Sequence, residues 1–129
     1  MHKGFLRTGA ISGGIAVALG AFGAHGLKQI VPPETVTTFQ TGVQYQMYHS
    51  LALLAVAIIY ERFPGKFLKL AGNFFISGII LFSGSLYILT MLKATETVGL
   101  NGIGIITPIG GLFFVAAWIL LFIGVSKKN

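Results

Sequence analysis

The chain has 129 residues, of which 54% are hydrophobic and 9% are charged, and its formal net charge is +6. A chain of this length suits one domain, and nine Lys and Arg with three Asp and Glu are too few to cover the surface of a water-soluble one. The positive charge does not indicate nucleic-acid binding, because the basic residues are scattered singly between apolar runs and lack aromatic neighbours that would stack on bases.

Four largely apolar runs are long enough to cross a bilayer as helices, which is typical of an integral membrane protein. They cover residues 5–24, 45–60, 70–92 and 103–125. The second run is short, but the uncharged stretch begins at Thr35, so a helix that starts near Pro33 and Glu34 would lie in the interface before it enters the membrane. The sequence therefore predicts one all-α domain, residues 1–129, built as a four-helix transmembrane bundle with an interfacial helical extension before the second helix.

The loops differ in their content of Lys and Arg, which favour the cytoplasmic side of a membrane. One side carries seven of them: Lys3, Arg7, Arg62, Lys66, Lys69, Lys127 and Lys128. The other side carries only Lys28 and Lys93. Both termini are therefore expected in the cytoplasm, with the chain in the cell membrane. An alternative is a secretory signal, since Lys3 and Arg7 precede an apolar run that ends in "AFGA".

Small residues recur at helical spacing within the predicted spans. In a bilayer such residues let neighbouring helices approach closely, so we interpret them as packing positions rather than the lining of a pore. The first span contributes Gly9, Gly13, Ala16, Gly20 and Gly23, the third contributes Ser77, Gly78, Ser83, Gly84 and Ser85, and the fourth contributes Gly110, Ala117 and Gly124.

The fourth span contains a proline and follows a glycine-rich segment. Pro108 suits the first turn of a helix, and Thr107 could cap it, so regular helix is expected to begin there. The preceding residues 99–107 would then form a glycine-rich outer loop that folds over the mouth of the bundle. Asn101 is the strongly polar side chain of that loop. Trp118 falls inside the span and is interpreted as a packing residue.

Two histidines are the candidate functional residues, because ionisable groups in membrane domains are rare and usually face the interior. Tyr45 and Gln46 precede His49 by about one helical turn, and the antiparallel first span would bring His25 to the same half of the bundle. A polar cluster of His25, Tyr45, Gln46 and His49 is thus predicted as a ligand-binding or proton-handling site. The alternative is structural, with His49 hydrogen-bonded between helices and His25 capping the end of its own helix.

The residues that carry most enzymatic or metal chemistry are scarce. Two imidazoles leave a tetrahedral metal ion short of ligands, and without cysteine there is no thiolate to add. Glu34, Glu61 and Glu96 are the acidic residues, and all three fall in predicted loops. We therefore expect no metal, no cofactor and no catalytic residue.

Four stretches, in order, resemble a known family: "GAFGAHGLK", "FQTGVQYQMYHSLALL", "SGSLYIL" and "TPIGGLFFVAAW". They are similar to the signatures of the YgdD/YwdK-like small membrane proteins, a domain-of-unknown-function family with a eukaryotic branch. The resemblance covers nearly the whole chain, with a mild departure at Phe39 and Gly42, where family members often carry an aromatic residue and an alanine. It implies a four-helix integral membrane protein and brings no established activity.

The leading hypothesis for function is a non-enzymatic scaffold, assembly or accessory factor that binds membrane lipids and either a second copy or another membrane protein. An oligomeric transporter or channel subunit with a polar site around His25, Tyr45 and His49 is the alternative. A third possibility is a membrane enzyme acting on lipid or quinone, with His49 or Glu34 as base.

Overall fold

The computed structural model describes residues 1–96 and 102–127, and within them every regular element is helical. The elements are α1 (Lys3–Ala24), the 3-10 turn η1 (Leu27–Gln29), α2 (Pro33–Ile59), α3 (Lys66–Gly78), the π-helical segment η2 (Ile79–Ser83), α4 (Gly84–Ala94) and α5 (Ile103–Ser126). Because α3, η2 and α4 follow one another without a break, the chain forms four rods, each long and apolar enough to cross a membrane. The predicted all-α fold with four membrane-spanning helices is confirmed.

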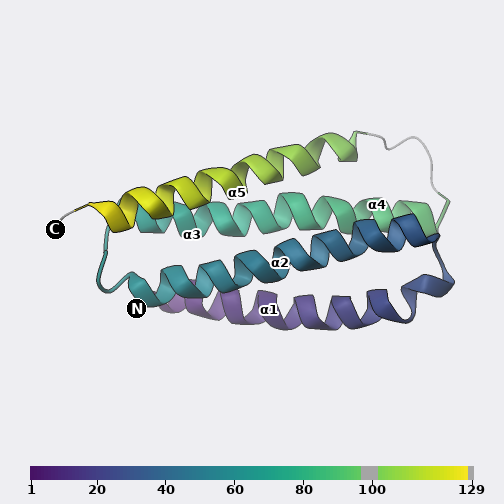
Figure 1. Cartoon of the computed structure of the whole chain (residues 1–129), viewed down its shortest axis with the longest axis horizontal. Helices are drawn as coiled ribbons and strands as arrows, with labels where there is room; N and C mark the ends of the chain where they lie inside the picture. Colours follow the sequence, from purple (N-terminus) through teal and green to yellow (C-terminus); the bar gives the residue numbers. More distant parts are fainter. Residues whose placement is uncertain (97–101, 128–129) are drawn as a thin grey trace.

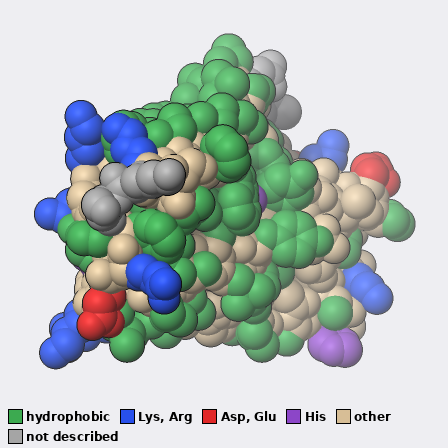
Figure 2. Space-filling model, turned by 60° about the vertical axis from the view of Figure 1, so that its left-hand side comes forward, with side chains coloured by type: hydrophobic (Ala, Val, Ile, Leu, Met, Phe, Trp, Pro, Cys, Tyr) green, Lys and Arg blue, Asp and Glu red, His purple; other side chains and the backbone are tan. Residues whose placement is uncertain are grey.

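The rods lie side by side in chain order (Figure 1). α1 packs on α2, α2 packs on the α3–η2–α4 rod, and that rod packs on α5. Both chain ends and the α2–α3 loop lie at one end of the bundle, on the left of Figure 1, while η1 and the end of α4 lie at the other. Charged side chains gather at the two ends, and hydrophobic ones dominate between them (Figure 2).

The first and second helices begin with different caps. His2 caps α1, because its Nδ1 accepts a hydrogen bond of 3.1 Å from the Phe5 backbone N–H. The His2 ring also stacks on the Phe5 ring, with 3.8 Å between centroids, and meets the edge of Tyr60. α2 begins at Pro33 with Glu34 in its first turn, as the sequence predicts.

The small residues of α1 lie against α2. A Cβ added at Gly9 would be 3.1 Å from the Ser50 carbonyl oxygen, and one added at Gly23 would be 2.6 Å from the Gln40 amide nitrogen. Gly13 and Gly20 lie more loosely against the same helix, and Ala16 is fully buried. This close approach is what small residues permit between membrane helices.

The last helix approaches the third rod through Gly110. A Cβ added at Gly110 would be 2.3 Å from the Phe82 backbone nitrogen, and Gly78 lies under the Phe114 ring from the other side. Ala117 is fully buried in the same contact. Ser77 is half-buried, whereas a Cβ at Gly84 would meet nothing within 4 Å, so Gly84 makes no close approach within the described chain.

The start of α5 differs from expectation. The helix begins at Ile103, five residues before Pro108, so the prediction that regular helix begins at Pro108 is wrong. Proline is tolerated at this position because its missing N–H removes only one helical hydrogen bond, the one to the Gly104 carbonyl. That carbonyl lies in the first turn of the helix, where the backbone can bend or be solvated. Thr107 does not cap the helix, because its hydroxyl hydrogen-bonds the Ser85 hydroxyl at 2.5 Å. Asn101 and the rest of 97–101 fall outside the described residues.

Candidate functional site

The polar centre of the bundle lies on α2, where His49 is buried with both ring nitrogens engaged. Its Nδ1 lies 2.7 Å from the Tyr45 carbonyl oxygen, and its Nε2 lies 3.2 Å from the indole nitrogen of Trp118. A carbonyl can only accept and an indole N–H can only donate. The two partners therefore fix one neutral tautomer, with the proton on Nδ1 and the lone pair of Nε2 facing Trp118.

Aromatic rings enclose the same imidazole. The Phe114 ring of α5 stacks on it, with centroids 3.6 Å apart and planes 7° apart. Phe75 lies 5.7 Å away, measured between ring centroids, and Tyr45 lies 5.9 Å away. Only 5% of His49 is exposed. His49 therefore joins α2 to α5 as a neutral, hydrogen-bonded and stacked side chain.

A second set of hydrogen bonds, the Gln46 network, joins three helices through Ser12, Gln46, Ser50 and Tyr87. The Gln46 amide nitrogen donates to the Ser12 carbonyl oxygen at 2.8 Å, and its Oε1 accepts from the Tyr87 hydroxyl at 2.6 Å. The Ser50 hydroxyl lies within hydrogen-bonding distance of both the Gln46 carbonyl, at 2.6 Å, and the Ser12 hydroxyl, at 2.7 Å. These bonds connect α1, α2 and α4 in the interior of the bundle.

The structure separates the four residues that the sequence placed in one cluster. Tyr45 and His49 are neighbours, but Gln46 turns to the other side of α2 and contacts α1 and α4. His25 is exposed at the end of α1, where its backbone N–H bonds the Phe22 carbonyl. The neighbouring Gly23 packs on Gln40, nine residues before His49, which is about 14 Å along α2. His25 and His49 therefore do not share a site within this chain.

Sequence reasoning missed the partners of both hydrogen-bonded sets. Trp118 is 69 residues from His49, and Tyr87 is 41 residues from Gln46. Trp118 and Tyr87 both fall inside apolar runs. The indole N–H and the phenol O–H of such residues indicate that a hydrogen-bond partner is needed, but they do not indicate which residue supplies it.

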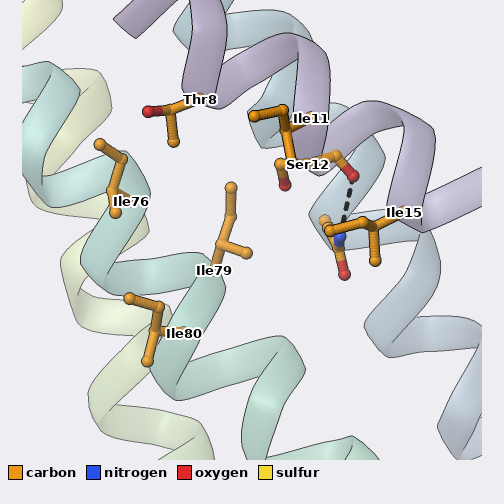
Figure 3. A pocket seen from close by; sticks show the side chains of 8 residues that line it. Thr8, Ile11, Ser12, Ile15, Ile76, Ile79 and Ile80 are labelled. Atoms are coloured by element: carbon orange, nitrogen blue, oxygen red, sulfur yellow. Dashed lines mark hydrogen bonds between the residues drawn. The ribbon is translucent and has the colours of Figure 1, made fainter. Parts of the chain in front are cut away.

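A groove opens on one side of the bundle, between α1 and the α3–η2 segment (Figure 3). Its volume is about 330 Å³, and its lining is Thr8, Ile11, Ser12, Ile15, Gln46, Ile76, Ile79 and Ile80. We call it the α1–α3 groove. Gln46 is one of its polar lining residues, and the dashed line in Figure 3 marks the bond from the Gln46 amide to Ser12. Six of the eight side chains that line it carry methyl groups, namely the five isoleucines and Thr8, so the groove is mainly apolar.

Comparison with known proteins decides the family. Residues 19–111 match the family described as "Protein of unknown function (DUF423)". The chain belongs to this family. The UPF0382 membrane protein YwdK of Bacillus subtilis is 42% identical over 126 residues, which is 97% of this chain and 98% of that protein. A UPF0382 membrane protein of Haemophilus influenzae is 43% identical over 129 residues, covering 100% and 98%.

The UPF0382 inner membrane protein YgdD of Escherichia coli K12 is 40% identical over 118 residues, covering 92% of this DUF423 chain and 86% of that protein. No solved structure matches. The names of the relatives agree with the four apolar rods, so this member of the DUF423 family is a small multi-pass membrane protein. The family resemblance seen in the four sequence stretches is confirmed.

The chemistry open to this DUF423 protein follows from where its polar groups lie. Within residues 1–96 and 102–127, no group of three His, Cys, Asp or Glu side chains is placed to hold a metal ion. Across the same ranges, each buried side-chain nitrogen or oxygen has a hydrogen-bond partner. The buried polar side chains of these ranges therefore have their hydrogen bonds satisfied inside the bundle.

Proposed function

We propose that the protein is a non-enzymatic accessory factor of the cell membrane that acts by binding a transmembrane helix of another membrane protein. The observation that carries this proposal is that both ring nitrogens of His49 are hydrogen-bonded inside the bundle, one to the Tyr45 carbonyl and the other to the Trp118 indole. A group held in this way supports packing rather than acid–base chemistry. The remaining route to function is the outer surface of the bundle.

The outer surface of α1 is suited to a helix partner. Ala10, Gly14, Ala18 and Ala21 are exposed, and they lie on the side of α1 that faces away from α2. We call them the α1 outer face. A Cβ built at Gly14 meets nothing within 4 Å. Because small residues three or four positions apart on one helix face permit close helix–helix contact in lipid, this face supports docking of a further helix.

Both termini are proposed to lie in the cytoplasm. The seven-to-two distribution of Lys and Arg supports this orientation, and the two chain ends lie at the same end of the bundle (Figure 1). The chain has no cysteine, so single-cysteine variants give a clean test. We expect Gln29→Cys to react with an impermeant maleimide in intact cells and Ser126→Cys to react only after permeabilisation. The reverse pattern would contradict the orientation.

Helix docking is tested by in-cell crosslinking and affinity capture with a matched pair of variants. Gly14→Leu fills the α1 outer face, and Gly104→Leu fills an exposed position on α5 that is equally free of neighbours. We expect crosslinked membrane-protein adducts with the wild type and with Gly104→Leu, and their loss with Gly14→Leu. Equal adducts from all three proteins, or none from the wild type, would contradict the proposal.

The alternative of an oligomeric transporter or channel subunit draws less support from the site. It requires His25, Tyr45 and His49 to line a common path, but His25 is exposed at the end of α1 and His49 is enclosed by aromatic rings. A liposome flux assay would favour transport if the wild type conducted a solute and His49→Ala did not.

A further inference from the structure

We propose that the α1–α3 groove binds one acyl chain of an anionic phospholipid from the leaflet on the side of the chain termini. This inference is independent of helix docking at the α1 outer face. It rests on the lining of the groove, its size, its depth in the membrane and the charge at its nearer end.

The lining selects a hydrocarbon occupant. Ile11 and Ile15 form the α1 wall, and Ile76, Ile79 and Ile80 form the opposite wall. The polar lining residue Gln46 is already bonded inside the protein, because its amide nitrogen donates to the Ser12 carbonyl (Figure 3). Its Oε1 accepts from the Tyr87 hydroxyl. A ligand therefore gains contact with the walls without having to supply hydrogen bonds, which is the property of an acyl chain.

The size selects a single chain over a helix. A three-turn helical segment about 10 Å wide and 16 Å long occupies on the order of 1,200 Å³. The groove holds about 330 Å³. A second transmembrane helix would only rest on its rim, whereas one hydrocarbon chain can enter and contact both walls.

The depth of the groove indicates the leaflet. Its α1 residues run from Thr8 to Ile15, which is roughly 8 to 18 Å along the helix from Lys3. Most of that range lies within the half of a hydrocarbon core of about 30 Å that is nearer the termini. Phe5 packs against Gly72 between the groove and this end of the bundle, so the groove is reached sideways from lipid.

The charge at the same end indicates the headgroup. Lys69 lies seven residues before Ile76 on α3, two helical turns closer to the interface, and is exposed. Arg7 is exposed one residue before Thr8. Among the described residues, the acidic side chain at this end is Glu61, and it lies 3.6 Å from the terminal amine of Met1. The surroundings of a headgroup are therefore basic, which favours an anionic lipid.

The wall also contains the irregular turn of the fold. Ile79 and Ile80 belong to η2, the π-helical segment, so the backbone departs from α-helical geometry where it lines the groove. π-Helical turns are rare and occur frequently at functional sites. This backbone feature is independent of the volume and charge of the groove.

The chain-binding step is tested with the full-length protein in nanodiscs that contain phosphatidylglycerol carrying a photoactivatable group on one acyl chain. We expect adducts on peptides covering 11–15 and 76–80 to exceed those on the equally lipid-exposed positions of α5. Ile80→Trp should abolish the groove adducts, whereas Ile105→Trp should not. These two side chains are matched, with 64% and 68% of their surface exposed.

The wild-type map does not depend on how well any variant folds, so it decides the proposal by itself. Labelling spread evenly over α1, α3 and α5 would overturn it. Adducts joining two protein chains through 76–80 would assign the groove to a helix and would also overturn it. Groove labelling that persists while Gly14→Leu abolishes protein capture would support the groove and keep the two proposals distinct.

The headgroup is tested by competition between phosphatidylglycerol and phosphatidylcholine carrying the same photoactivatable chain. We expect the wild type to prefer the anionic lipid in the groove. Lys69→Gln should reduce that preference by about fivefold, as expected for one basic residue near an anionic headgroup. Lys93→Gln, at the opposite end of the bundle, should leave it unchanged. Equal labelling by the two lipids would overturn the assignment of an anionic lipid.

Discussion

Replacing Gly110 by alanine tests how tightly α5 is fitted to the third rod. The added Cβ would stand 2.3 Å from the Phe82 backbone nitrogen and 2.7 Å from its Cα. Ordinary contact begins at 3.4 Å, and backbone atoms cannot rotate out of the way as a flexible side chain can. The helix must therefore move outward by about 1 Å, since packed interiors tolerate little extra volume.

The adjacent glycine supplies the matched control. A Cβ at Gly111 would lie 3.9 Å from the Phe82 ring, which is an ordinary contact. Alanine in a helix is favoured over glycine by roughly 0.5–1 kcal/mol, and this gain applies to both variants. Overpacking costs about 1–3 kcal/mol and applies only to Gly110→Ala. We therefore expect Gly110→Ala to lower the free energy of unfolding and Gly111→Ala to leave it unchanged or raise it slightly.

Reversible unfolding in mixed micelles, followed by circular dichroism at increasing dodecyl sulfate, measures the difference between the two variants. The single tryptophan adds a local readout, because the Trp118 indole bonds His49 and would be displaced with α5. We expect a changed emission maximum for Gly110→Ala only. Equal stability and equal emission for the two alanine variants would refute the close approach at Gly110.

Three further substitutions test the hydrogen bonds by the same unfolding assay. His2→Ala should lower stability by about 1 kcal/mol and His2→Asn should restore most of it, because asparagine also caps a helix; equal loss in both would contradict the capping role. Gln46→Leu should lower the free energy of unfolding by about 0.6–1.7 kcal/mol in the wild type. The loss should be smaller when Tyr87→Phe is already present, because there is then no Tyr87 hydroxyl to lose its acceptor; additive losses would argue against the Tyr87–Gln46 bond. Trp118→Phe should cost about 0.6 kcal/mol and add little to His49→Phe, whereas full additivity would separate the two side chains.

Much of the fold could be predicted because it depends on local composition. A run of about 20 apolar residues has one low-energy state in a bilayer, a helix that satisfies its own backbone, wherever its neighbours lie. The start of α2 at Pro33 and the end of α1 at Ala24 followed from capping residues. The five small residues of α1 share one face by periodicity alone, and that face lies against α2.

The candidate site could be predicted only in part. The sequence identified His49 as a buried polar group, but its partners come from α5, and their contact depends on how far each helix is rotated about its axis. A rotation of one residue, about 100°, would turn His49 from Trp118 toward lipid. Tyr45 and Gln46 are adjacent in sequence, so their side chains point about 100° apart around α2 and face different helices. Asn101 lies outside the described residues, so its place in the outer loop stays a prediction.

The sequence by itself therefore determined that the chain has four membrane-spanning helices, where the second helix begins, and which face of the first helix is small enough to pack closely. Each of these properties is a sum over neighbouring residues, so it does not depend on distant parts of the chain. Only the tertiary structure decided that Trp118 holds His49, that Gln46 ties α1 to α4, and that a groove remains beside the π-helical turn. Those features arise from the relative rotation and depth of separate helices, which in lipid are set by packing and hydrogen bonds between residues far apart in sequence.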